Sequence, residues 1–496
     1  MTQVTLAVIA KGGWGNQDGS IDPVALKKAV IDHKVGSVLN TTAHALSVDT
    51  WWQVITQIQD ETKNNKLQIP VVYGLLCRCW SLTTGVRKIN KFFDTIKLKK
   101  CVPDNMELQK ILSLVPSKLL EELSIETEVD YFTKKLQGEV MFKLLLHCII
   151  SHKDNSLRTM ESAYESLFFK LISGKHHQGS ISISSISERL STINFAYFEQ
   201  LYQTCTRLYK QDIGKEAKSI IRFDSTIVAL STKLLNTGYQ LKGGNAENVR
   251  QLKFTIGYAD IPEIVHFYTD QSHTSENLAL KETIIEQSKN DITSIKVFDK
   301  GITARNTYDM FTDNGIKFIS RIGVTAKHDK VKPYKTSKKL PVETATLKII
   351  SDDWCQLYGD KGKKAKYLVR RIEAIRLADN ELIVFVTNCE DLTSTEATEL
   401  YKRRWDIEVF FKFIKQLLNF KHLVNRSENG IKVVLYVTMI AAILLLAYKK
   451  VNHLNGYKIP KQKFANELET EMLKQFIILC GGNPERLNEI LLYNTT

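Results

Sequence analysis

Residues 219–230 have the sequence SIIRFDSTIVAL, in which one aspartate, Asp224, stands in a run of Ile, Val and Phe. A short apolar run of this kind predicts a buried β-strand. A carboxylate beside a buried strand costs free energy unless it is paired or bound to a metal ion. The strand therefore predicts a sheet-containing core and makes Asp224 a candidate functional residue.

The segments after this strand alternate between strand-like and helix-like patterns. RQLKFTIGYA (250–259) and EIVHFYTD (263–270) predict an antiparallel pair, and residues 275–289 predict a helix. SIKVFD (294–299) predicts another buried strand, which ends in Asp299, and IKFISRI (316–322) predicts the next. For either aspartate taken alone, a residue that caps the turn after a strand is the simpler explanation.

A third element changes that balance. Residues 401–415 are YKRRWDIEVFFKFIK, and from residue 394 onward we expect one long helix. At about 100° per residue, Tyr401, Arg404, Glu408 and Lys415 project from one stripe about 60° wide. A helix with surface Glu-Lys pairs is the plain alternative, but the spacing from Glu408 to Lys415 gives no direct pair. The apolar residues of another face, expected to pack on the sheet, are Ile407, Phe410, Phe411, Ile414 and Leu418.

These residues carry a resemblance to a known family. The pattern Tyr-x2-Arg-x3-Glu-x6-Lys is similar to the signature of insertion-sequence DDE transposases of the IS-four group. Asp224 in Asp-Ser-Thr, Asp299 in Asp-Lys-Gly-Ile and Arg321 in FISRI extend the resemblance over roughly residues 106–448. Many relatives have Gly where this chain has Ser225.

The resemblance implies an α/β fold with an RNase H-like catalytic core. In such a core Asp224 lies on the first strand, Asp299 follows the fourth, and Glu408 lies on a later helix. All three would be catalytic and would hold two Mg²⁺ ions, with Mn²⁺ as a substitute, because such hard cations prefer oxygen ligands. The residues expected to bind DNA are Tyr401, Arg404, Lys415 and Arg321.

The implied function is metal-dependent cut-and-paste cleavage and strand transfer at insertion-sequence ends. The implied partners are double-stranded DNA, as element ends and target, and a second copy of the chain in a synaptic homodimer. We expect a cytoplasmic, nucleoid-associated protein with no membrane contact. The alternative is a non-catalytic DNA-binding product that occupies element ends and inhibits transposition. Trp354 or Trp405 could stack on a flipped base, but a place in the core is the stronger expectation for both.

Such transposases carry a β-rich insertion between the second and third carboxylates. The stretch from 323 to 392 has short β-like runs and many lysines, each of which faces either DNA or solvent. The candidate DNA-facing lysines are Lys327, Lys330, Lys332, Lys335, Lys338, Lys339, Lys361, Lys363, Lys364 and Lys366.

The N-terminal stretch differs from the rest of the chain. Residues 1–75, with GSVLN at 36–40 and IPVVYG at 69–74, resemble the start of a family-three glycoside hydrolase barrel. Leu75 and Leu76 stand where that family has a sugar-binding Asp, and the rest of the barrel is missing, so we expect a non-functional fragment. Residues 76–105 would be a junction, and Met106 would be the native start.

Two further regions are helical by pattern. Residues 106–215 predict a helical region, either DNA-binding or purely structural, in which Ser156 and the Ser/Ile run 180–186 open helices, although that run could also form a strand. Val433–Tyr448 is apolar but short for a membrane span, so we expect a buried core helix. The expected divisions are 1–75, 76–105, 106–215, 216–322 (first segment of the core), 323–392 (insertion), 393–450 (second segment of the core) and 451–496 (helical tail).

Composition agrees with a folded protein that meets a polyanion. The 496 residues are 43% hydrophobic and carry a formal net charge of +14, which attracts nucleic acid or an acidic membrane surface. The eight cysteines are scattered without a pair of metal-ligand motifs, so we expect reduced thiols.

Overall fold

The structure is a computed structural model that describes residues 111–484. Within that range, residues 113, 153–154, 175–178, 214–219, 231–238, 241–249, 336–338, 360–361, 421–423 and 426 are not described. The predicted glycosidase-like fragment, the junction and the start at Met106 lie outside the described residues, as do Lys338 and Lys361.

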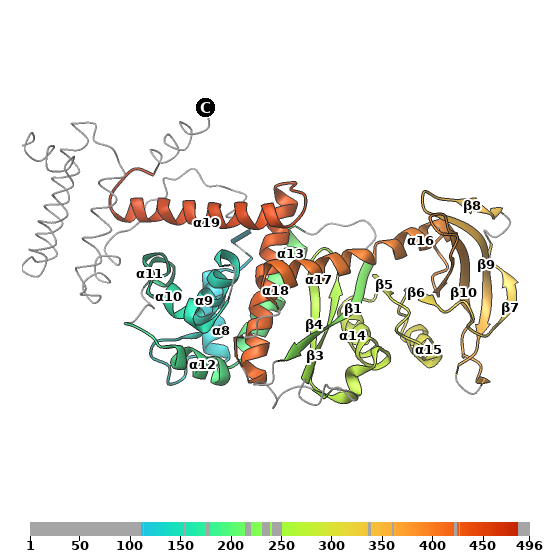
Figure 1. Ribbon diagram of the computed structural model, residues 1–496, viewed down its shortest axis with the longest axis horizontal. Helices are drawn as coiled ribbons and strands as arrows, with labels where there is room; N and C mark the ends of the chain where they lie inside the picture. The colour runs from blue at the N-terminus through green and yellow to red at the C-terminus, as the bar shows by residue number, and fades with distance from the viewer. Residues whose placement is uncertain are drawn as a thin grey trace, which may run out of the picture. The chain divides into compact units, whose positions relative to one another are not determined.

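Between residues 117 and 212, all the regular elements that the structure describes are helices (Figure 1). The Oγ atoms of Ser156 and Ser182 accept hydrogen bonds from the backbone N–H groups of Thr159 and Ser185 at 3.1 and 3.2 Å. These caps confirm the predicted helix starts, and the Ser/Ile run is a helix, not a strand. The helices are α8 (Ser117–Glu126), α9 (Gly138–Ser151), α10 (Leu157–Glu165), α11 (Leu167–Ser173), α12 (Ile183–Thr192) and α13 (Ala196–Asp212).

A mixed sheet follows, and its first strands match those predicted from the sequence. β3 and β1 pair antiparallel, β1 and β5 pair parallel, and β5 and β6 pair parallel. With β4 on the outer side of β3, the order β4-β3-β1-β5-β6 is consistent with an RNase H-like core. The strands are β1 (Ile220–Leu230), β2 (Tyr239–Gln240), β3 (Arg250–Tyr258), β4 (Pro262–Tyr268), β5 (Ile295–Phe298) and β6 (Phe318–Ile322).

The β-rich stretch continues this same sheet. β11 pairs antiparallel with β6, and β10, β9 and β7 follow outward in that order. Asn388, directly after β11, is bonded to the residues at the start of β6. Its Oδ1 accepts from the Phe318 N–H at 3.0 Å, and its Nδ2 donates to the Ile316 carbonyl at 2.9 Å. The outer strands are β7 (His328–Pro333), β8 (Val342–Glu343), β9 (Leu347–Leu357), β10 (Val369–Arg376) and β11 (Leu382–Thr387).

The two faces of the sheet carry different helices. Ile221 and Phe223 of β1 pack against residues of α14 and α15. Ile220 and Val228, on the opposite face, share clusters with residues of α16, α17 and α18. Because side chains alternate along a strand, Asp224 lies on the α16–α18 face. The helices and the short 3₁₀ turn after β4 are η4 (Gln271–Thr274), α14 (Glu276–Asn290), α15 (Arg305–Asp313), α16 (Ser394–Lys402), α17 (Trp405–Leu417), α18 (Glu428–Val451) and α19 (Lys458–Leu479).

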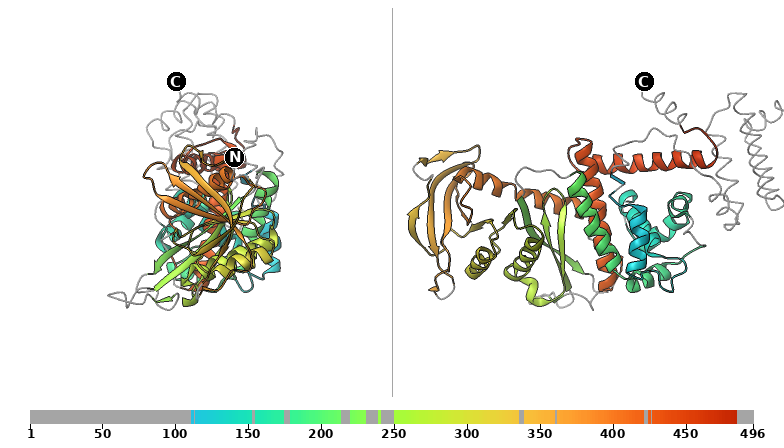
Figure 2. Two further views of the ribbon diagram at one scale, coloured as in Figure 1. Left: turned by 90° about the vertical axis from the view of Figure 1, so that its right-hand side faces the viewer. Right: turned by 180° about the vertical axis from the view of Figure 1, so that it is seen from behind.

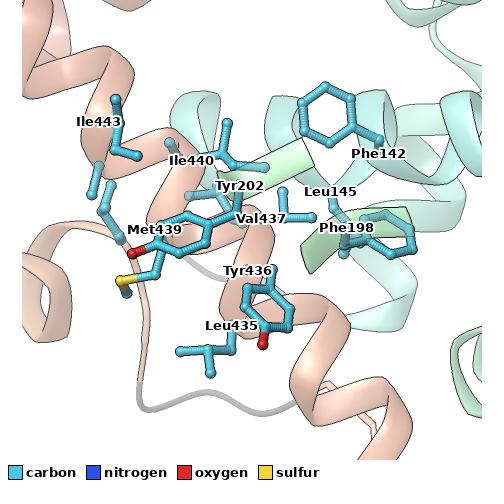
Figure 3. Close-up of a cluster of buried hydrophobic side chains, with 14 of the residues drawn as sticks. Phe142, Leu145, Phe198, Tyr202, Leu435, Tyr436, Val437, Met439, Ile440 and Ile443 are labelled. Atoms are coloured by element: carbon cyan, nitrogen blue, oxygen red, sulfur yellow. The ribbon is translucent and has the colours of Figure 1, made fainter. Parts of the chain in front are cut away.

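The apolar helix α18 is the centre of the largest core. It lies beside α13 (Figure 2, right), and its side chains meet those of Phe142 and Phe198 from α9 and α13 (Figure 3). Among the described residues it is the one helix long and apolar enough to cross a membrane. Its most apolar 18-residue stretch is 89% buried inside the protein. The prediction of a buried core helix is therefore confirmed. The same core includes residues of α8–α13, β3 and α17.

Candidate active site

Asp224 lies in the middle of β1, and its side chain is 21% exposed. Burial raises the pKa of this carboxyl to about 6, against the lowering effects of the Ser225 N–H and Arg404. Glu276 and Glu408 raise the pKa further, because a second negative charge disfavours ionisation. A cation bound nearby would relieve both effects.

Asp299 directly follows β5, the parallel neighbour of β1. Phe223 is in register with Phe298, so the residues that follow each of them, Asp224 within β1 and Asp299 just after β5, lie at the same level of the sheet. The Tyr401 hydroxyl donates to Asp299 Oδ1 at 3.3 Å, and the Lys300 N–H donates to the same oxygen at 2.7 Å. Asp299 is thus connected to the helix that precedes Glu408.

The predicted single long helix is wrong, because the chain forms two helices, α16 and α17, that meet at Arg403 and Arg404 (Figure 1). Both residues keep right-handed helical angles, but the Arg404 N–H bonds to the Tyr401 carbonyl at 2.8 Å and the Asp406 N–H bonds to the Arg403 carbonyl at 3.1 Å. These tighter turns interrupt the α-helical bonding pattern. Tyr401 and Arg404 remain neighbours across these turns, with the guanidinium carbon 5.9 Å from the centre of the Tyr401 ring. The Tyr401 hydroxyl donates to Asp299, and Arg404 pairs with Glu408.

Arg404 connects the first and third carboxylates. Its Nη1 lies 4.0 Å from Asp224 Oδ2, and its Nη2 forms an ion pair with Glu408 Oε1. The Arg404 Nε is buried without a hydrogen-bond partner in the described structure. One guanidinium therefore holds together carboxylates that are far apart in the sequence.

Arg321 and Lys415 differ in their relation to this group. Burial and Asp299 raise the pKa of Tyr401, while Arg404 and Arg321 oppose the rise, so Arg321 of β6 lies within electrostatic range of the site. Its Nη2 lies 3.8 Å from Glu381 Oε1. Lys415 lies in the last turn of α17, about 16 Å along the axis from Arg404 at 1.5 Å per residue. Its ammonium is 5.7 Å from the centre of the Phe411 ring.

Arg222, two residues before Asp224, was not predicted to matter. Its side chain is 1% exposed, and it donates from Nε to the Arg403 carbonyl at 3.1 Å and from Nη1 to the Ala259 carbonyl at 2.7 Å. It also lies 3.1 Å from Asp406 Oδ2. The strand that carries Asp224 is thereby fastened to the junction that carries Arg404.

A fourth carboxylate also approaches the site. Glu276 begins α14, and a Cβ placed on Gly301 would lie 1.7 Å from its Oε2, so only glycine fits beside it. Glu276 and Asp224 both oppose the effect of burial, which lowers the pKa of Lys253. In the sequence Glu276 is indistinguishable from an ordinary acidic residue in the first turn of a helix. Only the spacing of Gly301 behind Asp299 could have drawn attention to this position.

The apolar face of α17 is largely as predicted. Ile407, Phe410, Phe411, Ile414 and Leu418 are all buried. Trp405 corrects the expectation of a core tryptophan, because it is 63% exposed in the turn that begins α17. Trp405 is therefore a surface residue beside the largely buried Arg404, a distinction that hydrophobicity alone does not make.

Several of the predicted DNA-facing lysines have partners within the protein. Lys330 lies 2.8 Å from Asp353, and Lys366 lies 2.5 Å from Asp313. Lys335 donates to the Glu390 carbonyl at 3.1 Å. Their ammonium groups still lie at the surface of the outer strands, so both the DNA-facing and the solvated interpretation remain predictions.

Carboxylates suit a divalent metal, because hard cations prefer oxygen. The raised pKa of Asp224 fits such a site, since a buried carboxylate near two like charges gains from a bound cation. Within the described residues of the chain, however, no group of three or more His, Cys, Asp or Glu side chains lies close enough to hold an ion. Arg404 stands between Asp224 and Glu408 and supplies positive charge there.

Comparisons with known proteins agree with this geometry. A family model described as "Transposase DDE domain" matches residues 215–446, the region that holds all the site residues. The chain is 25% identical over 263 residues to a putative transposase, y4zB, of Sinorhizobium fredii, covering 52% of this chain and 69% of that one. It is 26% identical over 245 residues to a putative transposase for insertion sequence element IS4SA of Synechocystis, covering 48% and 62%.

A probable transposase for insertion sequence element IS5377 of Geobacillus stearothermophilus is 25% identical over 151 residues, covering 30% of this chain and 38% of that one. The chain thus spans from about two fifths to about two thirds of these relatives. Together with the family match, the relatives support an insertion-sequence transposase.

Proposed function

We propose that this chain is a metal-dependent cut-and-paste DNA transposase, of the IS-four group, that cleaves insertion-sequence ends and joins them to target DNA. One observation carries the proposal. Asp224, Asp299 and Glu408 come from distant regions of the sequence, yet Arg404 and Tyr401 connect them on one face of the sheet. We also propose that the site holds two metal ions, Mg²⁺ or Mn²⁺, and that its substrate is DNA.

The proposed role of each residue follows from the chemistry of its side chain. Asp224, Asp299 and Glu408 would hold two Mg²⁺ ions, which supply the charge that activates a water or a 3′-hydroxyl and stabilises the leaving oxygen. Arg404 presents a planar, permanently charged guanidinium that suits phosphate oxygens. Tyr401 keeps its proton, because burial and Asp299 raise its pKa, and so it serves as a hydrogen-bond donor. Arg321 and Lys415 extend the positive surface along the bound DNA.

We also propose in which assembly and where in the cell the reaction takes place. Two copies of the chain would hold two element ends in a synaptic homodimer, on DNA in the cytoplasmic nucleoid. The helical region α8–α13 would contribute to DNA binding. Light scattering on the complex with DNA ends tests the dimer, since a single copy per end at every concentration contradicts it.

The test of the site uses variants that keep shape and remove charge. Asp224→Asn, Asp299→Asn and Glu408→Gln should each abolish cleavage of DNA that carries the element ends, in Mg²⁺, while most DNA binding remains. Glu343→Gln, at a side chain that is 61% exposed and pairs with Lys348, is the matched control and should cleave normally. Wild-type cleavage by any one of the three would remove that residue from the site.

The alternative is a non-catalytic protein that occupies element ends and blocks transposition. It gains support if the unaltered chain binds those ends but leaves them intact in both Mg²⁺ and Mn²⁺. It fails if cleavage appears with metal and disappears on addition of a chelator.

A further inference from the structure

A hollow that is separate from the carboxylate group lies beside the junction of α16 and α17. It has a volume of about 630 Å³, and Asp406 and Val409 of α17 line it, whereas Arg404 and Glu408 do not. Its other walls come from the end of α13, from β1, from the turn after β3 and from the end of α18 with the segment that follows. The residues that matter for its chemistry are Arg222, Tyr258, Arg403, Lys449, Lys450 and Tyr457.

The hollow carries an excess of positive charge. Four cationic side chains line it, Arg222, Arg403, Lys449 and Lys450, against two carboxylates, Asp260 and Asp406, which leaves a net charge of +2. Both carboxylates are already paired inside the wall. Lys450 lies 2.6 Å from Asp260, and Asp406 Oδ2 lies 3.1 Å from Arg222 and 3.8 Å from Arg403.

Lys449 is the cation in this hollow that lacks a carboxylate of its own. Burial lowers the pKa of its ammonium, an effect that the more distant Asp406 opposes. The ammonium lies 4.4 Å from the centre of the Tyr457 ring. No ion pair joins it to any residue that the structure describes. A partly desolvated ammonium in this position gains free energy from a bound anion.

The aromatic rings of the hollow are not available to a nucleotide base. The Tyr258 ring stacks on Phe410 at 4.7 Å, and Arg222 lies 6.0 Å from its centre. The Tyr457 ring stacks on Phe413 at 4.6 Å and has Lys449 over it. Neighbouring side chains thus occupy both rings. The third ring, Tyr209, is buried and has Lys450 5.8 Å from its centre, so cationic groups remain the chemistry offered to a ligand.

The geometry points to a phosphate-binding site in this hollow, in which Lys449 and Arg403 hold the anion and the paired wall of Arg222, Asp406, Lys450 and Asp260 fixes their positions. The phosphate comes either from the backbone of bound DNA or from free inorganic phosphate. The DNA source rests on the proposed function. Arg403 and Arg404 are adjacent in the chain but face different sites, so DNA held at Arg404 also meets the positive field of the hollow.

The experiment uses the full chain with Lys449→Gln, and Lys289→Gln as the control. Lys289 is exposed in the last turn of α14, on the face of the sheet opposite Asp224, so the control removes the same charge from a surface with no proposed role in DNA binding. In the first arm, affinity for a short labelled duplex is measured at several salt concentrations. Loss of one phosphate contact should lower the slope of log affinity against log salt by about one unit in Lys449→Gln. The slope of Lys289→Gln should stay at the wild-type value.

The second arm measures thermal unfolding in phosphate and in chloride at equal ionic strength. Phosphate should raise the midpoint of the wild type and of Lys289→Gln but not that of Lys449→Gln, because a ligand stabilises only the state that binds it. Lys449→Arg, which keeps the charge, should restore the wild-type result in either arm. Equal midpoints in chloride verify that the variants fold.

The outcomes separate the two sources. A changed slope in the first arm identifies the DNA backbone, and an effect confined to the second arm identifies free phosphate. Lys449→Gln that behaves like Lys289→Gln in both arms overturns the inference. That failure is distinct from failure of the proposed function, which is measured by cleavage with the three carboxylate variants.

Discussion

A buried arginine holds each end of α16, but the two arginines have different partners. At the start of α16, Arg370 pairs with Asp352, and both side chains are completely buried. Asp352 Oδ2 also accepts from the Ser394 hydroxyl at 2.8 Å, while Arg370 Nη1 donates to the Leu392 carbonyl at 2.8 Å. The start of the helix is thus fixed by a closed network without access to solvent.

At the end of α16, Arg222 is as buried as Arg370, but its carboxylate partner Asp406 is 48% exposed. Solvent weakens an ion pair with one exposed member, so the bond to the Arg403 carbonyl carries more of the connection. The difference shows that the fold fixes where α16 starts more firmly than the junction that carries the reacting residues. Substitutions at the two ends should therefore have different consequences.

The largest effect on stability should come from Arg370→Met. Removing one member of a buried pair leaves Asp352 charged and uncompensated, which should cost about 3–5 kcal/mol of unfolding free energy. Arg376→Met is the control, because Arg376 is 38% exposed and pairs with exposed carboxylates, so it should cost less than about 1 kcal/mol. Urea unfolding followed by circular dichroism measures both. Equal losses of unfolding free energy in the two variants would show that the buried pair stabilises the protein no more than an exposed one.

Arg222→Met should affect cleavage more than stability. The loss of the Arg403 contact frees the junction and displaces Arg404, and a misplacement of about 1 Å can cost about 100-fold in rate. The unfolding free energy should fall by only about 1–3 kcal/mol, from the Ala259 carbonyl left without its donor, because Arg403 is exposed and its carbonyl can accept from water. Single-turnover cleavage, compared with DNA affinity, measures the split. A variant that loses stability and rate to the extent of Arg370→Met would contradict a distinct role for this end.

Asp224→Asn should stabilise the metal-free protein at pH 7. The folded-state pKa of about 6 lies above the ordinary value of 3.8, so the wild type loses stability as pH rises between these values. The amide avoids this loss, and its gain should be on the order of 2 kcal/mol at pH 7. The gain should vanish below the ordinary pKa. Thermal unfolding across this pH range, in the presence of a chelator, measures it, and a gain that is independent of pH would point to another cause.

The smallest effect should separate Lys415 from Arg404. Lys415→Ala should lower the salt slope of DNA binding by about one unit and leave the cleavage rate of bound DNA unchanged. Arg404→Ala should lower the slope and also slow cleavage, because Arg404 contacts two of the carboxylates. Binding and single-turnover assays on both variants measure this. If Lys415→Ala slows cleavage as much as Arg404→Ala does, Lys415 acts at the reacting centre and not only on the DNA beside it.

Local signals in the sequence were enough to predict much of the fold. The strands that carry Asp224 and precede Asp299, the helix caps at Ser156 and Ser182, and the buried α18 all follow from patterns that a few residues define. The helical start of the described chain and the β-rich stretch were also evident. That this stretch would extend the same sheet was not, because strand pairing depends on residues far apart.

The break between α16 and α17 could not be predicted from its own residues. The segment around Arg403 contains neither Gly nor Pro, and its residues favour continuous helix. Arg222, far away in the sequence, takes the Arg403 carbonyl as its acceptor and supports the tighter turn. Glu276 was missed for a similar reason, since only the folded chain brings it to Gly301 and Asp224.

The pairing of β6 with β11 also bears on how such a protein can change through evolution. The chain leaves the central sheet after β6 and returns beside it at β11, and Asn388 and Thr387 join the two positions through bonds to Ile316 and Phe318. The segment between them is also fixed at the start of α16, where Arg370 and Asp352 bond to Leu392 and Ser394. Changes in its surface residues that spare these bonds leave Asp299 and Glu408 in place. Surface specificity can therefore diversify in this segment while the chemistry stays constant.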